Sequence, residues 1–86
     1  MKIKTEYLTK IQRLCMRLFE IEDGEDMRGR NLVVGCIDKW LKKITDDEDK
    51  QIEIWDIVDK YKFDKDWNRT LQALEAAGYE VEKNDI

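Results

Sequence analysis

Apolar residues recur at intervals of three and four along four stretches of this chain, which is the spacing of amphipathic helices. The first stretch predicts a helix over residues 5–21. Its apolar stripe consists of Tyr7, Leu8, Ile11, Leu14, Cys15, Leu18 and Phe19. The segment EDGEDMRGR that follows, at residues 22–30, holds two glycines and a cluster of charges, and it predicts an exposed loop.

A second helix is predicted to begin at Asn31, because asparagine is a favoured residue at helix N-caps. Its apolar stripe consists of Val33, Ile37, Trp40, Leu41 and Ile44. Gly35 lies inside this helix, where glycine costs up to about 1 kcal/mol relative to alanine. We therefore expect Gly35 to mark close packing against another helix.

The third helix is predicted from a capping pattern as well as from spacing. The sequence TDDE at residues 45–48 fits a capping box with Thr45 as the N-cap. The helix is then expected to run to about Tyr61. Its apolar face consists of Ile54, Ile57, Val58 and Tyr61, with Trp55 beside them.

The fourth helix lies in the segment DKDWNRTLQALE, residues 64–75, for which Asp64 is the expected N-cap. Its buried stripe consists of Trp67, Leu71 and Leu74. Gly78 is the expected C′ residue of a Schellman-type helix end, which places Tyr79 against Leu74. This interpretation gives each feature of the segment a local structural reason.

The four helices predict an all-α fold, a small four-helix domain that covers residues 1–86 as a single helical domain. The sequence YEV after Gly78 leaves room for a short C-terminal strand. The predicted core consists of Leu14, Leu18, Ile37, Leu41, Ile57, Val58, Leu71 and Leu74. Of the three tryptophans, Trp40 and Trp67 fall within apolar stripes, and Trp55 is expected to be the most exposed, so that Trp55→Ala leaves the melting temperature nearly unchanged.

The residue types of the segment at 64–75 resemble those of an EF-hand calcium loop. Asp64, Asp66 and Asn68 occupy the first, third and fifth loop positions, Thr70 the seventh, Leu71 the eighth and Glu75 the twelfth. The sixth position holds Arg69, where the loop needs glycine for a turn with positive φ. We therefore expect no calcium binding, and no other metal or cofactor.

Residues 57–81 are also similar to the helix-turn-helix and wing of bacterial winged-helix regulators. A helix from about residue 65 to 77 would be the recognition helix. The resemblance implies DNA contacts from Lys65, Asn68, Arg69 and Gln72, of which the last three are residue types that read base edges. Asp64, Asp66 and Glu75 flank them, so DNA binding is kept as the alternative function.

Composition excludes several kinds of chemistry. The chain has no histidine, no serine and no glycine-rich phosphate loop, which removes Ser-His and Cys-His nucleophile pairs and histidine zinc ligands. An enzyme is therefore not expected. Cys15 and Cys36 lie among apolar residues and are expected to be reduced core residues of a cytoplasmic protein. With no run of about 20 apolar residues and no signal peptide at the N-terminus, we expect no membrane association.

Charge is divided unevenly along the chain, whose net charge is −4. Residues 1–44 carry ten Lys or Arg against seven Asp or Glu, and residues 45–86 carry six against thirteen. We therefore expect a small acidic protein–protein interaction module, a regulator or inhibitor of the kind common in phages and mobile elements. Its binding residues would be Trp55, Glu53, Asp56 and Asp59, facing a basic partner protein, and self-association is left open.

Overall fold

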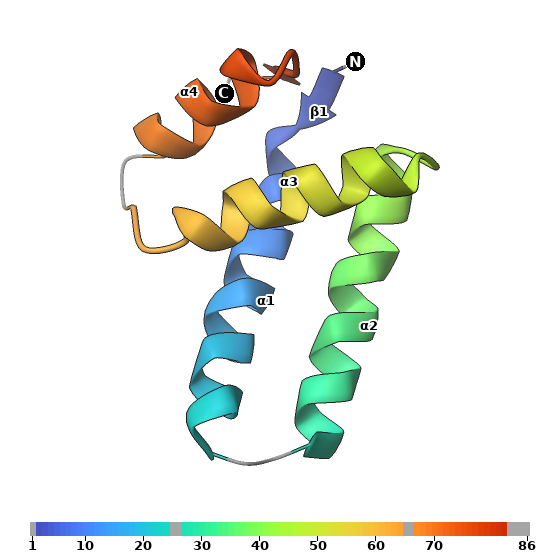
Figure 1. Cartoon of the computed structure of the whole chain (residues 1–86), viewed down its shortest axis with the longest axis vertical. Helices are drawn as coiled ribbons and strands as arrows, with labels where there is room; N and C mark the ends of the chain where they lie inside the picture. Colours follow the sequence, from blue (N-terminus) through green and yellow to red (C-terminus); the bar gives the residue numbers. More distant parts are fainter. Residues whose placement is uncertain (1, 25–26, 65–66, 83–86) are drawn as a thin grey trace.

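The computed structural model describes residues 2–24, 27–64 and 67–82, which form four helices and two short strands (Figure 1). In chain order the elements are β1 (Lys2–Lys4), α1 (Thr5–Gly24), α2 (Met27–Ile44), α3 (Glu48–Lys60), α4 (Asn68–Ala76) and β2 (Glu80–Glu82). Since helices dominate, the predicted all-α class with four helices is confirmed, and so is the short C-terminal strand.

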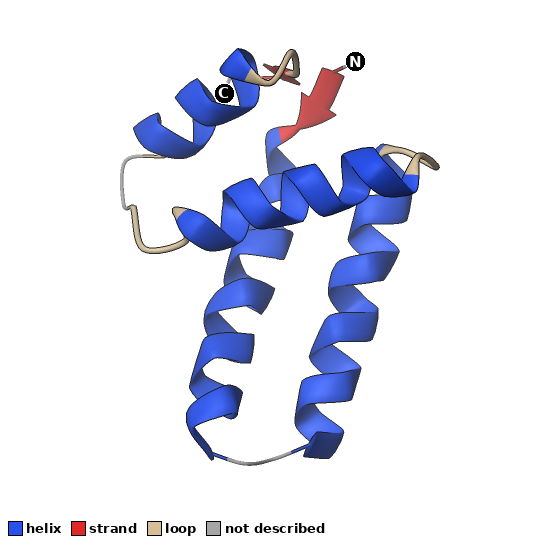
Figure 2. Cartoon of the chain, in the orientation of Figure 1, coloured by secondary structure: helices blue, strands red, loops and turns tan. Residues whose placement is uncertain are grey.

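α1 and α2 form an antiparallel hairpin, and α3 crosses both helices on one face (Figures 1 and 2). The core lies between these three helices and extends to α4 and the strands. It consists of Ile3, Leu8, Ile11, Cys15, Leu18, Val33, Ile37, Leu41, Ile54, Val58, Leu74 and Tyr79. Five of the eight predicted core residues are buried, whereas Leu14, Ile57 and Leu71 are only half-buried.

α2 begins at Met27, a full turn before the predicted N-cap, and Asn31 is an exposed residue inside the helix. The predicted loop at residues 22–30 was therefore wrong for 22–24 and 27–30, which are helical, and residues 25–26 lie outside the described part. Ile21 on α1 and Val34 on α2, which pack against the core, both lie within the predicted helix bounds, so their burial does not account for the extra turns. Glycine inside a helix costs only about 1 kcal/mol relative to alanine, so the glycines of this segment do not by themselves end the helices.

Gly35 does not mark a close helix contact. A Cβ added at this exposed position would meet no atom within 4 Å. The predicted close packing is therefore wrong within the chain, and the glycine simply weakens α2 by its conformational freedom.

α3 is capped by Asp47 rather than by Thr45. The Asp47 carboxylate accepts hydrogen bonds from the backbone N–H groups of Asp49 at 3.0 Å and Lys50 at 3.4 Å. The Thr45 hydroxyl accepts instead from the backbone N–H of Asp47, at 3.2 Å. The buried Gln51 amide donates to the Thr45 carbonyl at 2.7 Å, which ties the loop to the helix. The end of α3 agrees with prediction, since Tyr61 is its C-cap.

α4 begins after Trp67, whose backbone is left-handed with φ 61°. Asp64, the predicted N-cap, lies farther from the helix, yet its carboxylate accepts from the backbone N–H of Arg69 at 2.9 Å. The predicted Schellman end is confirmed. Gly78 has φ 95°, the Tyr79 N–H donates to the Leu74 carbonyl at 2.9 Å, and the Gly78 N–H donates to the Glu75 carbonyl at 3.0 Å.

The two strands join the ends of the described chain. β1 pairs with β2 in parallel, with Ile3 opposite Val81 and lysines at positions 2 and 4 opposite glutamates at positions 80 and 82. The Thr5 hydroxyl donates to the Glu82 carbonyl at 2.6 Å. Ile3 is almost fully buried, so this pairing adds to the core. The N-terminal strand was not predicted.

Candidate partner-binding groove

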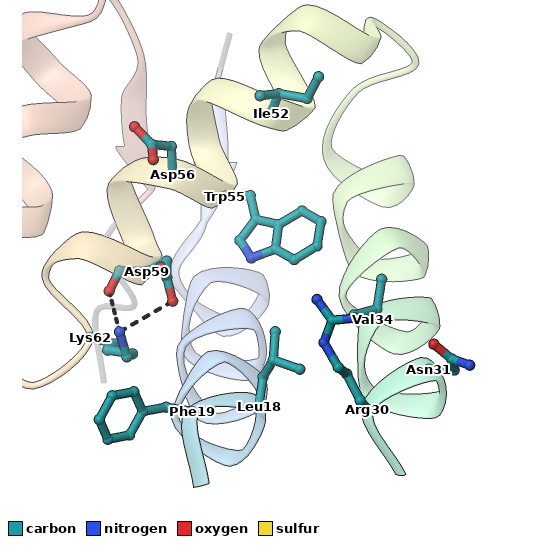
Figure 3. A pocket seen from close by; sticks show the side chains of 10 residues that line it. All are labelled: Leu18, Phe19, Arg30, Asn31, Val34, Ile52, Trp55, Asp56, Asp59 and Lys62. Atoms are coloured by element: carbon teal, nitrogen blue, oxygen red, sulfur yellow. Dashed lines mark hydrogen bonds and ion pairs between the residues drawn. The ribbon is translucent and has the colours of Figure 1, made fainter. Parts of the chain in front are cut away.

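A groove of about 520 Å³ lies where α3 crosses the α1–α2 hairpin (Figure 3). All three helices and the residues just after α3 contribute to it. Its lining consists of Leu18, Phe19, Arg30, Asn31, Val34, Ile52, Trp55, Asp56, Asp59 and Lys62. The groove exists only in the folded chain, because the contributing positions are far apart in sequence.

The apolar part of the groove is partly open to solvent. Leu18 and Val34 form its base on α1 and α2, and the Trp55 ring points toward them from α3 (Figure 3). Two lining side chains at opposite ends of the groove are largely exposed, Phe19 at 47% and Ile52 at 65% of their surface (Figure 3). Scattered exposed apolar residues are normal on proteins, but exposed apolar residues that line one groove are typical of binding sites.

Trp55 also packs against the core from the groove side. It is half-buried, as are Trp40 and Trp67, and all three rings contact the core cluster. The expected contrast between a surface Trp55 and two core tryptophans is therefore not seen. Trp55 combines a packing role with a position in the groove wall.

Lys62 lies at one end of the groove, where it contacts both α3 and α1. Its ammonium lies 3.2 Å from the Asp59 carboxylate and donates to the Asp59 carbonyl at 2.9 Å. The same ammonium lies 5.3 Å from the Phe19 ring centroid and 5.1 Å from that of Phe63. Only 12% of the Lys62 side chain is exposed, so these contacts replace water around the charge.

The predicted site residues are only partly brought together. Trp55, Asp56 and Asp59 line the groove, as does Arg30, which approaches from α2. Glu53 lies elsewhere, beside Tyr79. Burial of the phenol, a hydrogen bond to Glu53 and the Glu53 charge raise the pKa of Tyr79 to about 12. Glu53 therefore belongs to the contact between α3 and the chain end.

Sequence reasoning missed the groove residues on α1 and α2 and also missed Ile52. The position of Ile52 held a usable signal, because it is a large apolar residue outside the predicted 54-57-58-61 stripe. An apolar side chain off the buried face of a helix has to be exposed, and its exposure of 65% agrees.

Cys15 lies behind Trp55 and is fully buried. Burial and the nearby Asp59 charge raise the pKa of this thiol to about 12, outweighing the opposing effects of Lys62 and of a hydrogen bond with the Trp55 side chain. The thiol is therefore a packing group, since thiolates are the reactive form. Cys36 is a free thiol as well, but it is exposed, so its predicted core position was wrong.

The residues of the DNA-binding alternative lie on α4. Asn68, Arg69 and Gln72 are exposed there, next to the exposed Glu75, and Lys65 lies outside the described residues. The strand after Gly78 pairs with β1, whereas the resemblance to winged-helix regulators implied a wing. α4 therefore presents mixed charges and no wing within residues 67–82.

The residues that resemble an EF-hand loop do not form such a loop from Asn68 onward. Asn68 to Glu75, the fifth to twelfth positions of the resemblance, lie in α4, and the left-handed residue is Trp67 rather than Arg69. The seventh position of a calcium loop supplies a backbone carbonyl, and Thr70 lies inside α4, where its backbone is helical. Within the described residues, no group of three or more acidic or cysteine side chains is arranged to hold a metal ion.

Neither a family model, nor a curated protein sequence, nor a solved structure matches this chain. Among the described residues, no helix has the length and apolar character needed to cross a membrane.

Proposed function

We propose that this protein is a small non-enzymatic interaction module that regulates or inhibits a partner protein, which it binds at the groove between α1, α2 and α3. The observation that carries the proposal is that exposed Phe19 and Ile52 line the groove at its two ends, with the half-buried Trp55 between them (Figure 3). Tryptophan is enriched at interface hot spots.

The chemistry of the groove defines the kind of segment it would accept. Its apolar base accommodates large apolar side chains, and Asp56 on the exposed side of α3 favours a cation beside them. Asp59 is already paired with Lys62 and adds less. The partner is therefore expected to offer an apolar residue next to a lysine or arginine, in agreement with the basic partner expected from the acidic half of the chain.

Binding rather than catalysis is supported by the available side chains. The chain has neither histidine nor serine. The buried Cys15 thiol behind the groove stays protonated at neutral pH, because burial raises its pKa to about 12. The groove therefore holds neither a Ser-His nor a Cys-His pair, the common nucleophile and base of covalent catalysis. DNA binding through α4 is the weaker candidate, because acidic residues flank its exposed polar side chains.

The test compares two aspartate substitutions at exposed apolar positions. Ile52→Asp places a charge in the groove, and Leu32→Asp places the same charge on α2 at a side chain that is 72% exposed and lies outside the groove. Partners captured from the native host are identified by mass spectrometry, and binding of each purified candidate is then measured by calorimetry.

We expect Ile52→Asp to weaken the affinity at least about tenfold, because a charge would be buried against the partner's apolar side chain. Leu32→Asp should bind like the wild type. Equal binding by both variants would exclude the groove as the site. Specific retention of DNA rather than protein would favour the α4 alternative.

A further inference from the structure

The face of the α1–α2 hairpin that α3 crosses is only partly covered. The C-terminal half of α1 and the N-terminal half of α2 extend beyond α3 (Figure 1). Phe19 and Met16 on this part of α1 are 47% and 37% exposed, and Phe63 beside Phe19 is 58% exposed. A second helix lying alongside α3 would cover this area.

The charges of the groove complement each other under a two-fold rotation. Asp56 lies on the α3 wall and Arg30 on the α2 wall, on opposite sides of the Trp55 ring (Figure 3). In a two-fold interface each contact occurs twice, so Arg30 of one protomer would face Asp56 of the other, and the reverse. Arg30 already takes part in an interaction within the chain, but a guanidinium has five N–H donors and can serve another carboxylate.

We propose that a second copy of this chain occupies the groove, giving a symmetric dimer in which the α3 helices lie side by side. The α3 ridge of each protomer would enter the groove of the other, and the exposed Ile52 side chains would be covered by the apolar base of the partner's groove. This inference goes beyond the proposed function and requires no other protein. Self-association and partner binding would compete for one surface.

The test is a charge exchange followed by sedimentation equilibrium of the full chain over a wide concentration range. Wild-type protein should approach twice the monomer mass as its concentration rises. Arg30→Asp and Asp56→Arg should each weaken the dimer at least about tenfold, because each places like charges opposite one another. The double variant should regain most of the wild-type dimer constant, since the pair is restored with its signs exchanged.

Controls keep this result separate from misfolding and from the proposed function. Circular dichroism should show wild-type helix content in all variants, and Leu32→Asp should dimerise like the wild type. The charge-exchanged double variant should dimerise without regaining a foreign partner, because that partner keeps its original charges.

Wild-type protein that stays monomeric at every concentration overturns the dimer. A dimer that is insensitive to the single charge changes, or that the double variant does not regain, overturns its placement in the groove. In either case, loss of partner binding in Ile52→Asp would leave the proposed function intact.

Discussion

The ring of Phe19 meets the ring of Phe63 edge-on, with 5.5 Å between the two centroids. Phe19 belongs to α1 and Phe63 to the segment after α3, so this contact joins two parts of the chain at the end of the groove. The Lys62 ammonium lies over both rings, and the Gln12 amide donates to the Lys62 carbonyl at 3.0 Å. These contacts fix Phe19 and Lys62 in the lining at that end of the groove, and side chains that are already ordered lower the ordering cost of binding.

Trp55→Ala is expected to reduce the free energy of unfolding by about 2 kcal/mol, less than the ~3–5 kcal/mol typical of fully buried aromatic rings. The corresponding fall in melting temperature is roughly 10 °C for a chain of this size. This revises the expectation of a nearly unchanged melting temperature, because Trp55 packs against the core. Ile52→Ala, at a largely exposed position, is the matched control and should change stability by less than about 0.5 kcal/mol. An unchanged melting temperature for Trp55→Ala would support the original interpretation.

Alanine at Gly78 and alanine at Gly35 are expected to have opposite effects. Gly78→Ala should destabilise the fold by about 1 kcal/mol, since φ is +95° there and an L-residue is strained in that region. Gly35→Ala should stabilise the fold by up to about 1 kcal/mol, because α2 gains helix propensity and the added Cβ meets no atom within 4 Å. Urea unfolding of both variants measures the sign of each change in the free energy of unfolding. Destabilisation by Gly35→Ala would mean that this exposed face is packed in solution.

Calcium is expected not to bind with useful affinity, although the spelling of residues 64–75 resembles a calcium loop. Ligand positions from Asn68 onward are held in α4, so wrapping a cation would require unfolding that helix. A calorimetric titration with calcium chloride should show no saturable heat. A micromolar dissociation constant that is lost in Glu75→Gln would refute the prediction.

Stability is expected to fall between about pH 9 and pH 12. In the folded chain the pKa of Cys15 is raised from 9.0, and that of Tyr79 from 10.0, to about 12 in both cases, chiefly by burial. As pH rises, the unfolded chain ionises first and binds fewer protons than the folded chain, so the free energy of unfolding falls. The contribution is fully present below pH 9. Urea unfolding across this range measures it, and Cys15→Ala should lose less stability with pH than the wild type. Parallel profiles for the two proteins would show that the thiol has no part in the effect.

Local sequence determined much of the secondary structure of this protein. The 3–4 spacing of apolar residues specified α1 and the body of α2 and α3, since that spacing places them on one helical face. Gly78 specified the end of α4, because only glycine adopts positive φ there without strain. Local sequence did not predict the N-cap of α3, because neighbouring residues of more than one cap-forming type compete for that position. Thr45 and Asp47 both suit an N-cap, and only the geometry of the turn gives that role to Asp47.

Tertiary structure alone decided the groove and the joining of the chain ends. Phe19, Arg30 and Ile52 lie on three different helices, and no local pattern states how α3 crosses the hairpin. Ile3 and Val81 are paired across almost the full length of the chain, a contact whose closure entropy is recovered only once the helical core exists. The helices of the hairpin also continue into a segment rich in glycine and charge, where weak local propensity predicted a loop.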